Sequence, residues 1–248
     1  MSEPRRVRLL IEYDGGAYCG WQRQLNALSV QQVLEEALRA LTKAHVVLIG
    51  ASRTDAGVHA LGQVAHFDTT SPIPDEKIAF ALNPMLPRDI RVLDSAPTAP
   101  DFHARYHATC KLYRYLIHNA PHASALYRNR RAHVMYPLNI EAMRAEALDM
   151  LGTHDFAAFA ASGSAAKSTV RTVDWAEVSR DGKAVKLLIH GNGFLYNMVR
   201  IFAGTLILVG AGKLERGAIK RAITSGSRLD LGVTAPAHGL TLMRVEYD

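Results

Sequence analysis

The chain has 248 residues, of which 48% are hydrophobic and 21% charged, a balance typical of a globular protein rather than a disordered one. Lys and Arg outnumber Asp and Glu by 29 to 23, giving a net charge of +6, and no run of about 18 apolar residues could cross a bilayer. We therefore expect a soluble, cytoplasmic protein with one large domain or two smaller ones. Its two cysteines, Cys19 and Cys110, form no CxxC motif.

The first half of the chain alternates predicted strands and helices. A strand is predicted over residues 7–13, ending at the turn Asp14-Gly15-Gly16. Ser29 stands three residues before Gln32, the spacing of a capping box, and apolar residues then recur at helical intervals over residues 30–41. Further strands are predicted over 46–49, 63–67 and 90–93, and a second helix over 75–82. The order β-α-β-β-α-β is the ferredoxin-like pattern.

The second half repeats this order of elements. Asn139 is placed to begin a helix and Gly152 to end it, and Arg180-Asp181-Gly182 forms a turn between two strands. Strands are predicted over 112–117, 172–178, 184–189 and 240–247, and helices over 140–151, 197–209 and 215–223. The predicted fold class is α+β, with two ferredoxin-like halves whose sheets face a central cleft. The predicted domains are 1–104, carrying the catalytic loop discussed below, and 105–248.

The excess positive charge is concentrated in one block. Residues 102–140 contain neither Asp nor Glu, but they contain six basic residues: Arg105, Lys111, Arg114, Arg128, Arg130 and Arg131. Four tyrosines are interleaved with them: Tyr106, Tyr113, Tyr115 and Tyr127. This combination favours a phosphate-backbone partner, that is, a nucleic acid. Charge alone leaves a solvated basic face without a partner as the alternative.

Residues 51–60 are the most informative segment for chemistry. They lie between two predicted strands and place the Asp55 carboxylate two residues after the Arg53 cation, followed by Gly57, which lets a substrate approach the backbone. A carboxylate in such a loop can act as a nucleophile or a base. Taken alone, the Arg-Thr-Asp sequence is better explained by a salt-bridged turn.

Several motifs occur in one order along almost the whole chain. They are Tyr13-Asp14-Gly15, Gly20-Trp21-Gln22, Ser29-Val30-Gln31, residues 53–60, residues 63–67, residues 102–105, residues 111–115, residues 194–200 and residues 235–240. With these motifs the chain resembles the tRNA pseudouridine synthase A family. It departs from the usual family pattern at Gly16, Ala17, Ala51 and Ser52, which leaves the chemical groups in place.

The resemblance implies an isomerase that detaches a uridine base from its ribose, rotates it and rejoins it through C5 as pseudouridine. The reaction consumes nothing, so no nucleotide, metal or redox cofactor is implied. Asp55 matches the family's nucleophile or base, and its attack on C1′, its attack on C6 and its action as a base all stay open. Arg200 matches the cation that keeps a carboxylate ionised by lowering its pKa. The alternative for Arg200 is a salt bridge at the start of a helix.

The resemblance also implies base flipping and names three more substrate-binding residues. Extruding a base costs a few kcal/mol, and stacking it on an aromatic ring returns about 1–3 kcal/mol. Tyr113 matches the stacking platform, although a core tyrosine on the same strand face as Tyr115 is the alternative. Arg53 enters the gap left by the base or holds a phosphate. Leu240 covers the uracil or is an ordinary core residue.

The expected partners are tRNA and, by resemblance only, a second copy of the chain in a homodimer. The implied substrate is the anticodon stem-loop, at tRNA positions 38–40. Two rivals stay open: a non-catalytic RNA-binding module, and a pseudouridine synthase acting on another RNA such as rRNA. The joint presence of Asp55, Arg200 and Tyr113 favours the enzyme, because a pure binding module has no need of the carboxylate.

Overall fold

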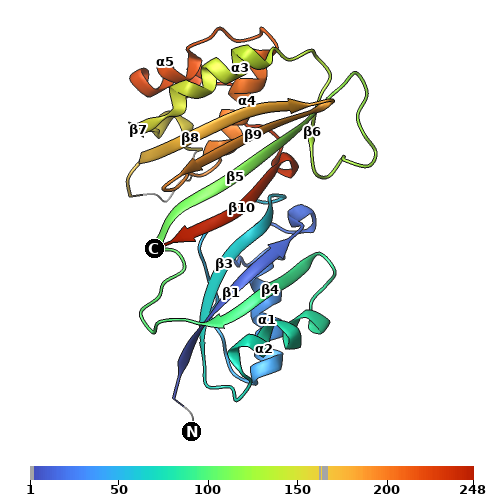
Figure 1. Cartoon of the computed structure of the whole chain (residues 1–248), viewed down its shortest axis with the longest axis vertical. Helices are drawn as coiled ribbons and strands as arrows, with labels where there is room; N and C mark the ends of the chain where they lie inside the picture. Colours follow the sequence, from blue (N-terminus) through green and yellow to red (C-terminus); the bar gives the residue numbers. More distant parts are fainter. Residues whose placement is uncertain (1–2, 162, 164–166) are drawn as a thin grey trace. The chain divides into compact units, whose positions relative to one another are not determined.

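A computed structural model describes residues 3–161, 163 and 167–248 of the chain (Figure 1). The chain divides into two compact units, Met1–Thr109 with Leu242–Asp248, and Cys110–Thr241. The first unit therefore runs five residues beyond the predicted domain boundary and also takes in the end of the chain. The reason is strand pairing, because β10 (Leu240–Tyr247) lies beside β3 (His59–Thr69) and the backbone of Met243 closely approaches Gly62.

The first unit is a sheet with two helices. Its strands follow the order β4-β1-β3, with β1 (Arg5–Tyr13) antiparallel to both neighbours. The remaining elements are β2 (Ile49–Gly50), β4 (Ile90–Pro97), α1 (Val30–Thr42), α2 (Asp75–Leu82) and the 3-10 helices η1 (Gly15–Ala17) and η2 (Asn83–Met85). The predicted order β-α-β-β-α-β of this half is confirmed, as is the α+β class.

Local sequence explains most of these elements. Alternate residues of β1 are buried: Val7, Leu9, Ile11 and Tyr13. The predicted cap of α1 is confirmed, because Ser29 Oγ accepts a hydrogen bond from the Gln32 backbone N–H at 3.2 Å. At the other end, Lys43 adopts a left-handed conformation with φ 57°, which ends the helix.

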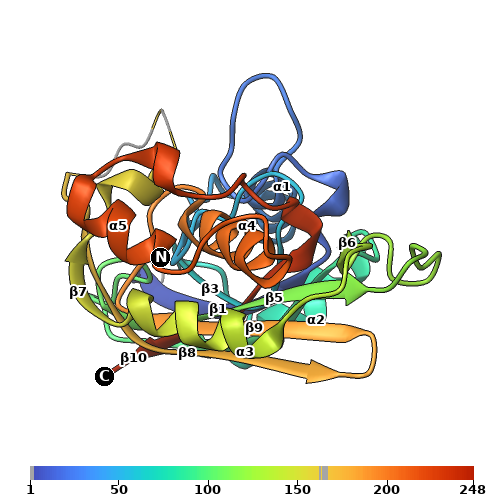
Figure 2. The same ribbon diagram turned by 90° about the horizontal axis from the view of Figure 1, so that it is seen from above.

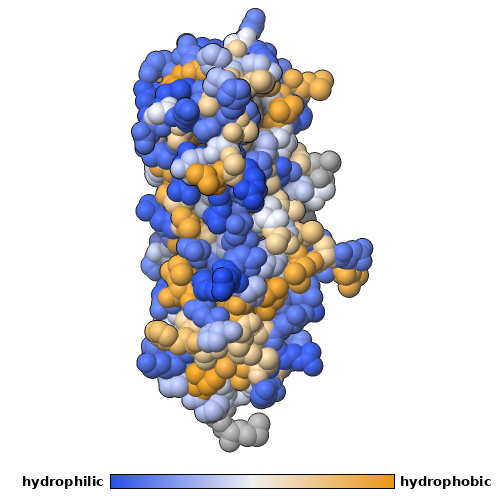
Figure 3. Space-filling model, turned by 90° about the vertical axis from the view of Figure 1, so that its right-hand side faces the viewer, coloured by the Kyte–Doolittle hydropathy of each residue, from blue (hydrophilic) through white to orange (hydrophobic). Residues whose placement is uncertain are grey.

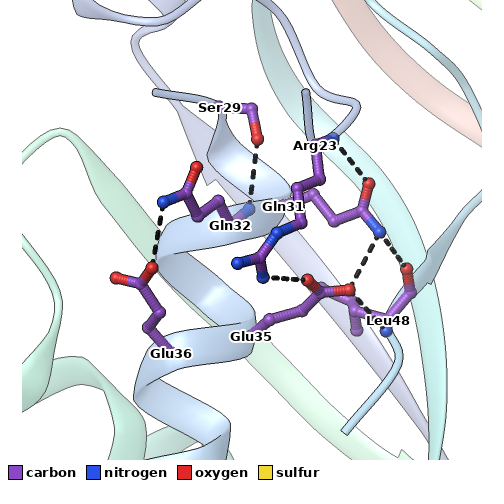
Figure 4. A network of polar contacts seen from close by, with 7 residues as sticks. All are labelled: Arg23, Ser29, Gln31, Gln32, Glu35, Glu36 and Leu48. Carbon is purple, nitrogen blue, oxygen red and sulfur yellow. Dashed lines mark hydrogen bonds and ion pairs between the residues drawn. The ribbon is translucent and has the colours of Figure 1, made fainter. Parts of the chain in front are cut away.

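The strand predicted over 46–49 is wrong except at its last residue, because only β2 is formed. A polar network around α1 gives the physical reason (Figure 4). The Leu48 N–H donates to Glu35 Oε1 at 3.1 Å, and the Leu48 carbonyl accepts from Gln31 Nε2 at 2.9 Å. Arg23 Nη1 donates to the other Glu35 oxygen at 3.0 Å. Helix side chains therefore satisfy the backbone of Leu48, and no strand neighbour is needed there.

The second unit has the strand order β5-β9-β8-β7, all antiparallel, with the short β6 parallel to β5. The strands are β5 (Ala108–Asn119), β6 (Ala132–Val134), β7 (Gly152–Asp155), β8 (Val170–Asp181) and β9 (Ala184–Gly191). The helices are α3 (Ile140–Ala147), α4 (Met198–Gly210), α5 (Ala218–Ser225), η3 (Leu148–Met150), η4 (Ala157–Phe159), η5 (Arg228–Asp230) and η6 (Ala237–Gly239). The largely buried α4 contacts both α3 and α5 (Figure 2).

Strands β6 and β7 were not predicted from the sequence. β6 has only three residues, and β7 (Gly-Thr-His-Asp) has no apolar alternation, so neither carries the period-two signal of a half-buried strand. Gly152, which was predicted to end the preceding helix, instead begins β7 with φ 99°. The regular helix already ends at Ala147, and a 3-10 turn follows it. The other predicted elements of this half occur within a few residues of their expected ends.

The described residues include no helix that is long and apolar enough to cross a membrane. On the face shown in Figure 3, hydrophilic and hydrophobic residues are interspersed.

Candidate active site

The loop that carries Asp55 connects β2 to β3 in the first unit. Along it, Arg53 is exposed, Thr54 is buried and Asp55 is partly buried. Thr54 Oγ1 shares a 2.7 Å hydrogen bond with the buried Tyr13 Oη, and the Thr54 carbonyl accepts from the Trp21 N–H at 3.0 Å. The residue before Asp55 is thus held through both its side chain and its backbone.

The chain after Asp55 is held as well. The Val58 N–H donates to the Asp55 carbonyl at 3.1 Å, which closes a tight turn, and the Gly57 N–H donates to the Tyr18 carbonyl at 3.2 Å. Gly57 has φ 79°, a conformation that glycine adopts without steric cost. Asp55 therefore lies in a loop whose backbone is fixed on both sides by segment 13–21.

Two glycines of segment 13–21 allow this close approach. A Cβ on Gly20, which has φ 85°, would lie 2.5 Å from the Thr54 carbonyl oxygen. A Cβ on Gly15 would lie 1.9 Å from the Val58 carbonyl oxygen. The Gly15 N–H also donates to Nδ1 of the buried His59 at 3.1 Å, which ties segment 13–21 to the start of β3. Only glycine permits backbone contact at both positions.

Tyr113 and Tyr115 lie on one face of β5 in the second unit, and both side chains are buried. The Tyr113 ring meets Phe194 edge to face, with 5.3 Å between the ring centroids. Tyr115 Oη donates to the Pro236 carbonyl at 2.8 Å, and burial raises the pKa of this phenol above its usual range. The core position expected as the alternative for Tyr113 therefore agrees with its burial, and Tyr115 is the more deeply buried of the two.

Arg200 lies in the first turn of α4. Its Nε donates to the Ala235 carbonyl at 2.8 Å and its Nη1 to Asn197 Oδ1 at 2.6 Å. Asn197 precedes the helix in a left-handed conformation with φ 63°. Leu240, at the start of β10, is 5% exposed. Arg200 thus joins the start of α4 to the segment that leads into Leu240.

The structure divides the predicted site residues between the two units. Arg53 and Asp55 lie on the β2–β3 loop of the first unit, and Tyr113, Arg200 and Leu240 lie in the second. Within the second unit, hydrogen bonds and ring contacts connect three separate motifs: residues 111–115, 194–200 and 235–240.

No local sequence pattern predicted the residues that hold the Asp55 loop. Tyr13 and Gly20 belonged to motifs of the family resemblance, but no local pattern assigned them a role. Tyr13 and Thr54 are 41 residues apart, so their hydrogen bond is visible only in the folded chain. The one sequence signal was the glycine at position 20, which is required by a positive φ and a close backbone contact.

Comparisons with known proteins show the family to which the chain belongs. A family model described as tRNA pseudouridine synthase matches residues 9–107 and 147–248. A protein named tRNA pseudouridine synthase A from Acetivibrio thermocellus is 54% identical over 98% of this chain and its own full length. Proteins of the same name from Ruminiclostridium cellulolyticum and Geotalea daltonii are 50% and 46% identical over the same shares.

Among solved structures, a chain of a Cbf5-Nop10-Gar1 complex is similar with a TM-score of 0.38 and 12% identity, over 95% of this chain and 48% of that one. The family assignment follows from the sequence matches. The family model covers parts of both units, and the motifs that hold Asp55 and Arg200 fall inside the matched ranges. The chain belongs to the tRNA pseudouridine synthase family, and it is therefore an isomerase that forms pseudouridine in tRNA.

Proposed function

We propose that this enzyme acts on uridines of the anticodon stem-loop, at tRNA positions 38–40, and that Asp55 is its catalytic carboxylate. The observation that carries the proposal is the fixed geometry of the Asp55 loop. Thr54 is held by Tyr13 and Trp21, while Asp55 itself keeps partial access to solvent. A backbone that is fixed on both sides of a partly buried Asp55 suits a group that must meet a reacting atom in a defined position.

Asp55 must be ionised to act either as a nucleophile or as a base. As a nucleophile it attacks C1′ of the ribose or C6 of the uracil; as a base it removes a proton. In each case the glycosidic bond to N1 breaks, a bond from C1′ to C5 forms, the C5 hydrogen leaves as a proton, and N1 takes up a proton. A nearby guanidinium favours the ionised carboxylate. Arg200 is the proposed partner because it matches the cation of the family motif at residues 194–200, and its guanidinium is held by Ala235 and Asn197.

The target base must leave its stack to reach the carboxylate. Extrusion costs a few kcal/mol, of which stacking on one aromatic ring returns about 1–3 kcal/mol. We assign that ring to Tyr113, with Leu240 covering the other side of the uracil. The exposed Arg53 either occupies the gap in the RNA or holds a phosphate. The contact of Tyr113 with Phe194 supports this role, because it fixes the plane of the platform.

Positive charge in the second unit suits an RNA backbone. Burial and the neighbouring Arg130 and Arg131 lower the pKa of Arg114, so three cations lie close to one another. The Arg131 guanidinium also lies 3.7 Å from the centroid of the Tyr127 ring. A phosphate backbone relieves such repulsion by neutralising the cations. We propose that the enzyme works in the cytoplasm as a homodimer and that one tRNA touches both subunits.

Substrate choice is tested by mapping pseudouridine in unmodified tRNA transcripts after treatment with the enzyme. We expect modification at uridines 38–40 and none when these positions carry cytidine. An rRNA fragment with an exposed uridine loop serves as the competing substrate. Modification of the rRNA fragment alone would overturn the tRNA assignment, and modification elsewhere in the tRNA would overturn the anticodon assignment.

Binding of tRNA should depend strongly on salt. The logarithm of the association constant should fall by about 0.9 for each duplex phosphate that the protein neutralises, per tenfold rise in salt. Arg130→Ala and Arg131→Ala should each reduce this slope by about one, because each removes one cation from the block. Arg144→Ala is the control, since Arg144 is already paired with Glu141. A salt slope near zero in the wild type would contradict backbone recognition.

Tyr113→Phe should keep the stacking surface and lose only the hydroxyl. If the hydroxyl assists removal of the C5 proton, we expect turnover to fall by about 100-fold, at the low end for general acid–base catalysis, with tRNA affinity unchanged. Tyr113→Leu, which also lacks the ring, should weaken binding as well. Turnover and affinity are both measured with unmodified tRNA. Wild-type turnover in Tyr113→Phe would exclude a chemical role for the hydroxyl.

The Tyr13–Thr54 hydrogen bond should act as a positioning contact for Asp55. Tyr13→Phe and Thr54→Val each remove it and should lower kcat by about tenfold or more with little change in KM, because the loop loses its anchor before Asp55. Thr54→Ser keeps the hydroxyl and should stay close to wild type. The double variant should be no worse than the worse single variant. Additive losses in kcat would show that the two residues act independently.

A further inference from the structure

A cluster of three potential metal ligands lies in the second unit, outside the proposed reaction. Asp174 Oδ2 lies 2.8 Å from His190 Nδ1 and accepts a hydrogen bond from Cys110 Sγ over 3.7 Å. One ligand atom from each of the three residues lies within 4.8 Å of the other two. The three residues come from β5, β8 and β9, which are neighbours in the sheet.

An irregularity in β8 brings the carboxylate to this position. Val173 pairs with Gly191 and Trp175 pairs with His190, so Asp174 is an extra residue without a partner position on β9. A bulge of this kind re-aims the side chain of the extra residue. The Trp175 ring stacks parallel to the His190 imidazole, with 5.5 Å between centroids and 4° between planes. The sheet thus orients both the carboxylate and the imidazole.

We propose that Cys110, Asp174 and His190 bind one zinc ion. A sulfur, an imidazole nitrogen and a carboxylate oxygen together form a ligand set that suits Zn²⁺. Mg²⁺ and Ca²⁺ prefer oxygen ligands alone, so the thiolate selects against them. Three protein ligands leave the fourth tetrahedral position to water.

Two of the three separations between ligand atoms are close to those that such a site requires, and the sulfur and nitrogen atoms lie within 4.8 Å of each other. With Zn–S near 2.3 Å and Zn–N and Zn–O near 2.1 Å, tetrahedral geometry places sulfur about 3.6 Å from oxygen and nitrogen about 3.4 Å from oxygen. The sulfur–oxygen distance is 3.7 Å, and the nitrogen–oxygen distance of 2.8 Å must widen by about half an ångström. The Asp174 side chain, which is 41% exposed, has room for this movement.

Zinc binding requires deprotonated ligand atoms, and the charge of the ligands then offsets the charge of the ion. The thiol releases its proton to solvent, His190 coordinates through the Nδ1 lone pair with its proton on Nε2, and Asp174 binds as the carboxylate. Two negative ligands then neutralise the dication. Because the ion would join three adjacent strands, it should raise the melting temperature of the protein as free zinc increases.

The test is a zinc titration of the full-length protein after treatment with a chelator, followed by calorimetry and by Co²⁺ substitution. We expect one equivalent of Zn²⁺ and, with Co²⁺, a thiolate charge-transfer band in the near ultraviolet. Cys110→Ser should abolish this band and weaken zinc binding by more than about 100-fold, beyond the loss typical of an outer-shell partner. Asp174→Asn, at an exposed position, should weaken binding while leaving the metal-free melting temperature unchanged.

Cys19→Ser is the matched control, because the other cysteine lies in the first unit. It should keep the stoichiometry, the affinity and the cobalt band. Absence of a bound equivalent in the wild type would overturn the proposal and leave only the 2.8 Å contact between His190 and Asp174. Binding that survives in Cys110→Ser, or that is lost in Cys19→Ser, would overturn the assignment of the ligands. Pseudouridine formation by the metal-free protein is a separate readout, so neither result bears on the role of Asp55.

Discussion

Replacing Asp55 by Ala or by Asn should abolish pseudouridine formation while leaving tRNA affinity close to that of the wild type. Loss of a general base costs about 10²–10⁴-fold in rate, and loss of a nucleophile leaves no route to a covalent intermediate. The Asn variant is the sharper of the two, because it keeps the size and polarity of the side chain and removes only the charge.

The expected retention of binding follows from the position of the residue. Asp55 is a single anionic side chain, whereas affinity for the RNA backbone depends on cations such as those near Arg114. Thermal melting of both variants is measured beside the wild type, so that a loss of activity can be separated from a loss of folded protein. A variant that melts early would report a structural role, and its activity would need correction for the folded fraction.

Gly20→Ala should also lower turnover strongly, although residue 20 carries no side chain. Alanine at φ 85° is strained, and its Cβ would lie 2.5 Å from the Thr54 carbonyl oxygen, so the backbone beside Asp55 must move. A displacement of about 1 Å at a reacting group costs about 100-fold in rate. We therefore expect kcat to fall by about this factor, together with a lower melting temperature.

Gly212→Ala is the matched control for this variant. Gly212 also has a positive φ, 67°, but a Cβ there would meet no atom within 4 Å. The Gly212→Ala variant should therefore lose about 1 kcal/mol of folding stability from backbone strain alone, and its kcat should match that of the wild type. Equal losses of kcat in the two variants would show that contact with Thr54 does not position Asp55. The measurement is kcat per folded molecule, with the folded fraction taken from thermal unfolding.

Sequence patterns predicted the elements whose signals are local. The Ser29 cap, the helix Asp75–Leu82 and the last strand Leu240–Tyr247 are all confirmed, because each depends on a side-chain preference or a periodicity within a few residues. The short strands β6 and β7 carry no such signal. The apolar run around Leu48 favours a strand. However, side chains of Glu35 and Gln31 make the backbone hydrogen bonds of Leu48 that a neighbouring strand would otherwise make.

The candidate site was also predictable only in part, because the contacts that support it join distant segments of the chain. Resemblance to a family predicted Asp55, Tyr113 and Arg200 as site residues, but it did not predict which residues hold them in position. The hydrogen bond between Tyr13 and Thr54 and that between Arg200 and Ala235 join residues 41 and 35 positions apart, so neither can be predicted from local spacing. The pairing of the chain's last residues with β3 likewise depends on tertiary structure, and it is why the first unit contains both ends of the chain.

The most direct test of the central claim is release of tritium from unmodified tRNA labelled at uracil C5, with the wild type beside Asp55→Asn. Formation of the bond from C1′ to C5 expels the C5 hydrogen, so every turnover frees one label. We expect steady release by the wild type and none by Asp55→Asn, with equal tRNA binding by both proteins. Release at a similar rate by both would contradict the assignment of Asp55 as the catalytic carboxylate.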